Sequence, residues 1–286
     1  MISEHHKRGG LVMVRVVTDS SCDLPAELLK KHRIPFVSLN VFINNKTYRE
    51  DVEINPEEFW DLMSRSGELP KTSQPTPADF AKVFSTIQEE GDTPLCITIS
   101  SGLSGTYQSA VLGRQLSGNK AYVFDSLAGS ISHGIQVLIA ARMAENGYEL
   151  EAILPVLEDY RENVKIIIPL KTLENIVKGG RLSRVQASIA NILNIKIILH
   201  GVKGKVELLK KVRGTRRFRE AVLEIIDDAA KTGKKIFGIT HVDNLDDATF
   251  SANEIKKRVE DAEVIIGKMG PTIATYAGLG GLILAL

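Results

Sequence analysis

Short, mainly apolar runs alternate with helical patterns along most of this chain. Residues 12–17 and 95–99 are runs of the kind found in buried strands, and each is followed by a polar turn and a helical pattern. One helix start is marked by Thr76, a residue type preferred at N-caps, with a proline after it and Asp79 in the first turn. The alternation predicts a parallel or mostly parallel sheet wrapped by helices.

This pattern covers the first half of the chain. Strands are expected at residues 12–17, 34–43, 95–99 and 122–125. Helices are expected at residues 24–32, 76–90, 106–116, 130–146 and 150–161. We therefore expect an N-terminal α/β domain over residues 13–162. Residues 1–12 are expected to form a disordered head, because their charged start lacks the apolar core of a signal peptide.

A second block begins near residue 164 and contains an antiparallel element. Turn residues separate the strand-like runs 195–199 and 206–212, which predicts a β-hairpin. Further strands are expected at 165–168, 235–241 and 262–267, and helices at 172–178, 185–192, 217–231 and 246–260. We expect a C-terminal mixed α/β domain over residues 163–286. The predicted fold class is thus α/β with two domains, a parallel sheet wrapped by helices plus a smaller mixed-sheet α/β domain.

The amino-acid composition excludes several classes of protein but does not indicate a function. With 286 residues, 43% hydrophobic and 25% charged, the chain has the make-up of a globular protein, which excludes disordered, fibrous and coiled-coil classes. Its formal net charge of +1 creates no global field that would hold a polyanion. Eight basic residues do cluster in one run, Lys203, Lys205, Lys210, Lys211, Arg213, Arg216, Arg217 and Arg219. Since no aromatic platform accompanies them, a solvated face is favoured over nucleic-acid binding.

Cysteine usage and hydropathy indicate a cytoplasmic protein without a membrane span. Cys22 and Cys96 fit no metal-binding spacing and could form at most one disulfide, so a reducing compartment is the simpler interpretation. The most apolar stretches fall short of the roughly 18 residues that a membrane span needs. No metal site is expected.

The turn Ser100-Ser101-Gly102-Leu103-Ser104-Gly105 is the first candidate site. It joins a predicted strand to a predicted helix, at the edge of the sheet where open α/β folds place ligands. Free hydroxyls and helix-start amides suit a carboxylate or a phosphate. The competing interpretation is that Ser104 only caps its helix. The turn lacks the Gly-Lys-Ser/Thr of a P-loop, which argues against nucleotide binding.

Three weaker candidates lie elsewhere. The segment 71–77, KTSQPTP, is a stiff polar loop that could present Thr72 to a ligand. Asp19, Ser20 and Asp23 follow the first strand and could bind a metal or a sugar, although helix capping explains them equally well. His241 with Asp243 could be a base and its orienter, but such a histidine is more often structural.

Four motifs in order resemble the DegV family. They are Lys71-Thr72-Ser73-Gln74-Pro75, Ser100-Ser101-Gly102-Leu103-Ser104-Gly105-Thr106-Tyr107, Lys178-Gly179-Gly180-Arg181-Leu182-Ser183 and Lys211-Val212-Arg213-Gly214. Each is weak alone, but their order over some 140 residues is specific. The resemblance extends over nearly the whole chain.

The resemblance implies a lipid carrier rather than an enzyme. Members of this family enclose one long-chain fatty acid, such as palmitate, between two α/β domains, and some present its carboxylate to a separate fatty-acid kinase. By this likeness, Thr72 and a serine of the turn hold the carboxylate, with Ser104 preferred over Ser101. Arg181 and Arg213 match family arginines near the acid end, which meet the kinase or the phosphate. No cofactor is implied.

The chain departs from the family near its C-terminus. A Thr-His-x-Gly-Pro-Gly stretch is usual there, whereas this chain has Thr275-Tyr276-Ala277-Gly278-Leu279-Gly280. Tyr276 therefore stands in the place of a histidine, and a phenol does not change charge near pH 7. A carrier tolerates this substitution more easily than a phosphate-transfer partner does.

Transfer energies favour a lipid over a small polar ligand. Each buried methylene contributes about 0.8 kcal/mol, so some fourteen of them contribute roughly 11 kcal/mol before ordering costs. Two rival functions remain open from the sequence. One is an enzyme acting on a phosphorylated or hydroxylated small molecule at the SSGLSG edge, and the other is a nucleic-acid or regulatory protein using the basic run.

Overall fold

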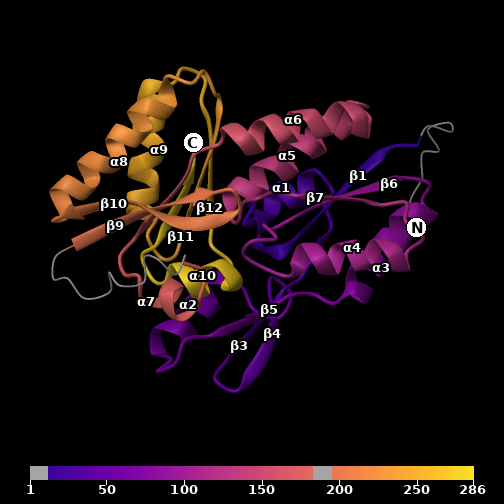
Figure 1. Cartoon of the computed structure of the whole chain (residues 1–286), viewed down its shortest axis with the longest axis horizontal. Helices are drawn as coiled ribbons and strands as arrows, with labels where there is room; N and C mark the ends of the chain where they lie inside the picture. Colours follow the sequence, from indigo (N-terminus) through magenta and orange to yellow (C-terminus); the bar gives the residue numbers. More distant parts are fainter. Residues whose placement is uncertain (1–11, 183–194) are drawn as a thin grey trace.

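Three sheets organise the protein in the computed structural model, which describes residues 12–182 and 195–286 (Figure 1). The two larger sheets belong to successive parts of the chain and lie beside each other. The helix expected at 185–192 and nearly all of the head expected at 1–12 lie outside the described residues.

The first sheet is parallel, as predicted. Its strands run in the order β2-β1-β6-β7, namely β2 (Phe36–Val37), β1 (Val14–Asp19), β6 (Thr93–Thr98) and β7 (Tyr122–Asp125). Successive side chains enter different cores. Val17 and Cys96 pack in the core formed with α3 (Pro77–Glu89) and α4 (Thr106–Leu116), whereas Val16 and Ile97 belong to the core that includes α5 (Ile131–Glu145) and α6 (Leu150–Asn163). Burial on both faces explains why these strands are mainly apolar.

A short helical segment follows the first strand. It comprises η1 (Ser20–Cys22) and α1 (Ala26–Lys31). Asp19 caps η1 by accepting a hydrogen bond from the Ser21 amide (3.1 Å), and its other carboxylate oxygen accepts one from the Ile99 amide (2.8 Å). Capping is thus the role that the structure gives Asp19.

A small antiparallel sheet is the main feature that the pattern missed. It has the order β4-β3-β5, with β3 (Asn40–Ile43), β4 (Lys46–Arg49) and β5 (Lys71–Ser73), and α2 (Pro56–Arg65) lies between β4 and β5 in sequence. The single strand expected at 34–43 is wrong, because it divides into β2 and β3 of different sheets. The break falls at Leu39, whose amide donates to the Ser20 hydroxyl (3.0 Å) instead of to a strand. Thr72 consequently lies on a strand rather than in the expected loop.

The second large sheet is mixed, as predicted. Its order is β10-β9-β8-β13-β11-β12, and only β11 and β12 pair in parallel. The strands are β8 (Ile166–Leu170), β9 (Ile195–Val202), β10 (Lys205–Arg213), β11 (Ile236–His241), β12 (Glu263–Lys268) and β13 (Leu282–Ala285). Two helices, α8 (Thr215–Ala230) and α9 (Leu245–Arg258), cover one face. Two further helices, α7 (Glu174–Lys178) and α10 (Pro271–Ala277), lie near the small sheet (Figure 1).

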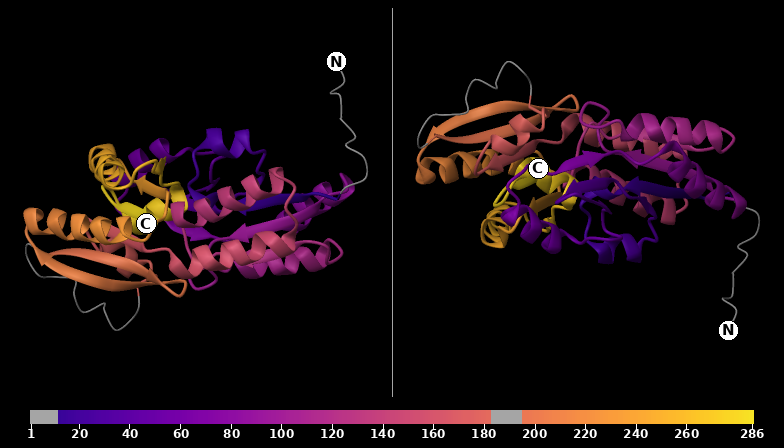
Figure 2. Two further views of the ribbon diagram at one scale, coloured as in Figure 1. Left: turned by 90° about the horizontal axis from the view of Figure 1, so that it is seen from above. Right: turned by 90° about the horizontal axis from the view of Figure 1, so that it is seen from below.

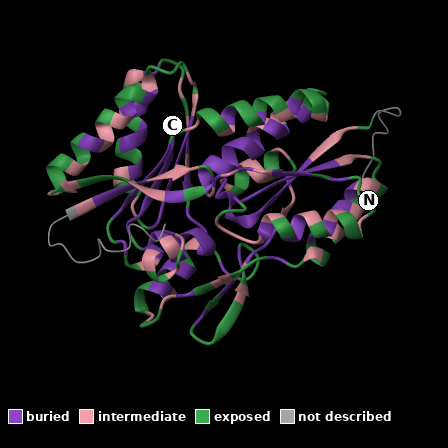
Figure 3. Ribbon diagram, viewed as in Figure 1, coloured by how far each residue is buried: buried purple, intermediate pink, exposed green. Residues whose placement is uncertain are grey.

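The opposite face of the mixed sheet packs against the first half of the chain. Buried α5 contacts strands of both large sheets, β1 on one side and β11 and β13 on the other. Gly238 on β11 makes this possible, since a Cβ there would overlap Ile131. Figure 2 shows the two sheets and their helices from above and below, and Figure 3 shows that the strands of both sheets are mostly buried where the halves meet. One continuous core therefore joins the halves.

Candidate functional site

A predominantly apolar cavity lies where the two halves meet. The space inside it is about 90 Å³, and about 830 Å³ when the open solvent at its mouth is included. Its walls come from β5, the SSGLSG turn, the β7–α5 connection, β8, the β9–β10 hairpin and α10. The cavity is thus built by elements far apart in sequence.

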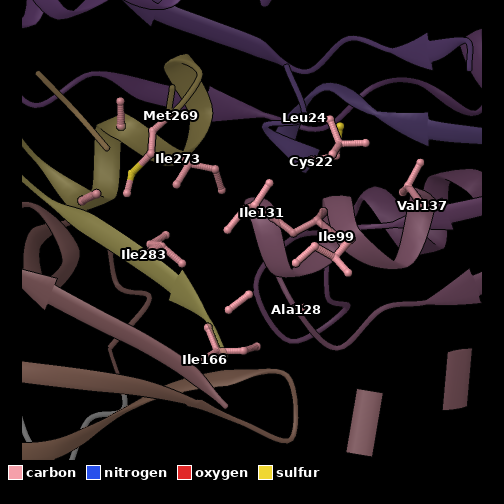
Figure 4. Close-up of a cluster of buried hydrophobic side chains, with 14 of the residues drawn as sticks. Cys22, Leu24, Ile99, Ala128, Ile131, Val137, Ile166, Met269, Ile273 and Ile283 are labelled. Carbon is pink, nitrogen blue, oxygen red and sulfur yellow. The ribbon is translucent and has the colours of Figure 1, made fainter. Parts of the chain in front are cut away.

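Aliphatic side chains from both halves line most of the cavity. Figure 4 shows Ile99 and Ala128 on the N-terminal side and Ile166, Ile273 and Ile283 on the C-terminal side. All five side chains are buried. Because these walls offer no hydrogen bonds, this part of the cavity favours a hydrocarbon.

Polar side chains gather on one part of the wall. The Thr72 hydroxyl and the Tyr276 phenol are joined by a hydrogen bond of 2.7 Å. The Arg181 guanidinium lies 4.7 Å from the centre of the Tyr276 ring, and Ser104 lines the same cavity. All four residues are half-buried. Two hydroxyls, a phenol and a cation beside an apolar cavity suit an amphiphile with a carboxylate.

Backbone carbonyls hold Arg181 in place. Its Nε donates to the Leu103 carbonyl (3.3 Å) and one terminal nitrogen donates to the Gly179 carbonyl (2.8 Å). Gly179 itself must be glycine, because a Cβ there would come within 2.5 Å of the Tyr276 ring. Gly180 follows with φ of +70°, a conformation that glycine adopts without strain. The two glycines end α7 as predicted and also seat the ring of Tyr276.

The SSGLSG turn packs against the hairpin of the other half. The Ser100 hydroxyl donates to the Gly204 carbonyl (2.7 Å) and accepts from the Gly102 amide (3.1 Å). A Cβ at Gly102 would come within 2.6 Å of the Gly204 carbonyl oxygen. Two of the turn's residues are therefore occupied in joining the halves.

Ser104 lies just before Gly105, the N-cap of α4, and its side chain forms local hydrogen bonds there. Its hydroxyl accepts from the Thr106 amide (3.3 Å) and is hydrogen-bonded to the Thr106 hydroxyl (2.9 Å), at the start of α4. The same residue lines the cavity. These local hydrogen bonds and ligand contact are compatible here, because a hydroxyl oxygen has one proton to donate as well as lone pairs to accept.

Two predicted site residues lie away from the cavity. Ser101 is exposed, its amide donates to the Asp125 carboxylate (3.2 Å), and it is not among the lining residues. Arg213 is exposed at the end of β10, also outside the cavity wall. The geometry thus gathers Thr72, Ser104, Arg181 and Tyr276, and leaves out Ser101 and Arg213.

The other candidates have structural partners. His241 accepts a hydrogen bond on Nδ1 from the Asn244 amide (3.1 Å) and lies against the ring of Trp60, which favours the structural interpretation over a base paired with Asp243. All eight residues of the basic run are exposed, and some form ion pairs, such as Lys210 with Glu224. Most of the run is thus the solvated face that the sequence favoured, while Lys205 also lines the cavity.

Glu50 is a buried carboxylate that holds a residue of the cavity wall by hydrogen bonds. The sequence did not indicate it. It accepts hydrogen bonds from the Ser20 hydroxyl (2.7 Å) and from the amide (2.8 Å) and hydroxyl (2.7 Å) of Thr272, a cavity residue at the start of α10. Burial raises the pKa of Glu50 to about 7. The nearby Asp23 accepts hydrogen bonds from the Gly270 amide (2.8 Å) and the Ser130 hydroxyl, and burial raises its pKa as well.

Metal-binding clusters and membrane-spanning helices are absent from the residues that the structure describes. Among them, no group of three or more histidine, cysteine or acidic side chains is arranged to hold a metal ion. No helix within residues 12–182 and 195–286 combines the length and apolarity needed to cross a membrane.

Comparison with known proteins identifies relatives of this chain. The model of a family described as "Uncharacterised protein, DegV family" matches residues 13–285. A "Fatty acid-binding protein" from Thermotoga maritima is 34% identical over 274 residues, covering 93% of this chain and 95% of the relative.

Solved structures show the same similarity. One describes fatty acid binding of a DegV family protein from Thermus thermophilus; it is 33% identical, with a TM-score of 0.88, over 96% of this chain and 99% of that one. Another is a DegV family protein from Eubacterium eligens loaded with heptadecanoic acid; it is 28% identical, with a TM-score of 0.83, over 95% and 98% of the two chains.

Proposed function

The chain belongs to the DegV family, and we propose that it binds one long-chain fatty acid, such as palmitate, between its α/β domains at 13–162 and 163–286. The observation that carries this proposal is the cavity, whose aliphatic wall adjoins the polar side chains of Thr72, Ser104, Arg181 and Tyr276. Relatives described as fatty-acid binders support it.

Tail and head group have separate roles in this proposal. The aliphatic walls supply affinity, since each buried methylene contributes about 0.8 kcal/mol. The hydroxyls of Thr72 and Ser104 donate to the carboxylate, and the Arg181 guanidinium supplies the opposite charge. Binding, rather than catalysis, is the function that such an arrangement serves. An enzyme acting at the SSGLSG edge is less well supported, because the Ser100 hydroxyl both donates and accepts structural hydrogen bonds and Ser101 lies outside the cavity wall.

We further propose that the protein carries its lipid in the cytoplasm and presents the carboxylate to a fatty-acid kinase. The free thiols of Cys22 and Cys96 suit a reducing compartment. Arg213 is an exposed cation away from the cavity, where a partner enzyme could reach it. Tyr276 lacks the titratable nitrogen of the family histidine, so carriage of the lipid is the better supported part of this function.

The first test is the content of the purified protein. Mass spectrometry of an organic extract from protein made in a bacterial host is expected to show about one equivalent of a saturated or monounsaturated acid of about sixteen carbons. Delipidated protein is expected to rebind hexadecanoic acid and to melt at a higher temperature with it, because a ligand that binds the folded state stabilises it. A lipid-free extract together with an unchanged melting temperature would contradict the proposal.

Arg181 and Arg213 are expected to have different roles, Arg181 in binding the fatty acid and Arg213 in presenting it to the kinase. Arg181→Ala is expected to weaken hexadecanoate binding about tenfold, since a hydrogen bond to a charged group contributes on the order of 1.5–3 kcal/mol and this side chain is half-buried. Arg213→Ala is expected to bind within twofold of wild type but to lose acyl-phosphate formation with a cognate fatty-acid kinase. Isothermal titration and a kinase assay measure the two effects. Equal binding by both variants would remove Arg181 from the head-group site.

A further inference from the structure

Gly129 lacks a side chain at a point of the cavity wall where one would fit. It lies between β7 and α5, and its φ is outside the left-handed region. A Cβ built there would lie 3.6 Å from the Ile99 Cδ1, 3.6 Å from the Leu103 Cδ1 and 3.7 Å from the Ile273 Cδ1, which are ordinary contact distances. Neither the backbone nor the protein's own packing therefore requires glycine at this position.

The other glycines of the cavity wall have a structural reason. A Cβ at Gly201 would come within 2.9 Å of the Ile166 Cδ1. Gly204 has φ of +77°, and a Cβ there would come within 2.5 Å of the Ser100 hydroxyl. Gly129 differs from both, because its Cβ would meet its neighbouring side chains, Ile99, Leu103 and Ile273, at ordinary contact distances, and all three line the cavity. A side chain at this position would project among them.

The neighbours of Gly129 place it next to the polar part of the cavity. Leu103 directly precedes Ser104, and Ile273 precedes Tyr276 by three residues on α10, which puts both on one face of that helix. A fatty acid whose carboxylate meets Ser104 would thus pass Gly129 with the first part of its tail.

We propose that Gly129 is a residue of the fatty-acid-binding site, whose missing side chain leaves room for the acyl chain just beyond the carboxylate. This inference rests on the proposed function. A larger residue at 129 narrows the path at a point that every bound acid crosses, so the loss of affinity is the same for medium and long chains. A residue at the far end of the cavity would instead affect long chains alone.

The test titrates delipidated protein with decanoic and hexadecanoic acids. Gly129→Ala is expected to weaken binding of both a few-fold, and Gly129→Leu about fifty-fold or more, because overfilling a packed site costs on the order of 1–3 kcal/mol. The factors are expected to agree between the two acids. Gly67→Leu is the matched control, since nothing lies within 4 Å of a Cβ at that exposed glycine, and it is expected to bind as wild type.

A second variant distinguishes an affinity loss caused by a filled cavity from one caused by misfolding. Adding Ile273→Ala to Gly129→Leu restores room beside residue 129 and is expected to regain at least part of the affinity for both acids. If the leucine variant does not fold, the alanine variant carries the test, because its extra methyl meets only ordinary contacts. Wild-type affinity in both Gly129 variants, or a loss confined to hexadecanoate, would overturn the inference while leaving the proposed function intact. Failure of the wild-type protein to bind either acid would instead refute the proposed function itself.

Discussion

Thr72→Val combined with Ser104→Ala is expected to lower the affinity for hexadecanoic acid by roughly a hundredfold or more. Each hydroxyl that donates to a carboxylate contributes on the order of 1.5–3 kcal/mol, and about 1.4 kcal/mol corresponds to a factor of ten. Valine keeps the shape of threonine on β5, so the change removes a donor rather than a wall of the cavity. Isothermal titration of delipidated protein measures the loss.

Binding of hexadecanol distinguishes the contribution of the carboxylate from that of the hydrocarbon tail. The alcohol buries the same hydrocarbon but has no charge, so the double variant is expected to bind it with nearly wild-type affinity. Ser101→Ala is the matched control, because Ser101 belongs to the same turn as Ser104 yet is exposed and lies outside the cavity wall. If Ser101→Ala weakens acid binding while Ser104→Ala does not, Ser104 is only a helix cap and the head group lies elsewhere.

Local signals in the sequence were sufficient for the parallel sheet, for the other strands of the mixed sheet and for most helices, but α2, α10 and β13, the strand between β8 and β11, were not predicted. Buried parallel strands are apolar on both faces, and caps such as Thr76 and the Gly179-Gly180 pair act within a few residues of the chain. The same locality explains the errors. The sequence of β2 and β3 predicts one strand, because the neighbouring residues do not indicate that the Leu39 amide donates to the Ser20 hydroxyl.

The candidate site shows the same division between local and long-range information. Thr72 and Ser104 were predicted from short motifs and the family resemblance, but their shared cavity depends on contacts across more than a hundred residues, such as the bond from Thr72 to Tyr276. No pattern in the sequence indicates that Arg181 is inside the cavity and Arg213 outside it. Glu50 was missed for a related reason: its partners, Ser20 and Thr272, are distant in sequence, and a lone glutamate after a polar strand looks like a surface residue.

Unfolding free energy is expected to fall by about 3 kcal/mol, through Glu50 alone, between pH 4.5 and pH 7. Burial is the largest cause that raises the pKa of Glu50 to about 7, from an ordinary value of 4.5; the charge of Asp51 adds to it, and hydrogen bonds from Ser20 and Thr272 oppose it. In this window the folded protein holds a proton that the unfolded chain has released. Raising the pH therefore favours the unfolded chain, by about 1.36 kcal/mol for each unit of pKa difference.

Glu50→Gln isolates this contribution, because the amide cannot ionise and its shape matches the protonated acid. Its oxygen can accept from the Thr272 amide, while its NH2 can donate to the hydroxyl oxygens of Ser20 and Thr272. Urea unfolding of both proteins is expected to give similar free energies below pH 4.5, and at pH 8 the variant is expected to be more stable by about 3 kcal/mol. Asp51 raises the pKa of Glu50, and Glu50 raises that of Asp23, so the difference between the two proteins reports Glu50 together with its interaction with these carboxyls. Glu68→Gln, at an exposed glutamate, is the control and is expected to follow the wild-type curve. If the difference in unfolding free energy between Glu50→Gln and wild type stays constant across this pH range, the pKa of Glu50 is the same in the folded and unfolded states, and the prediction is wrong.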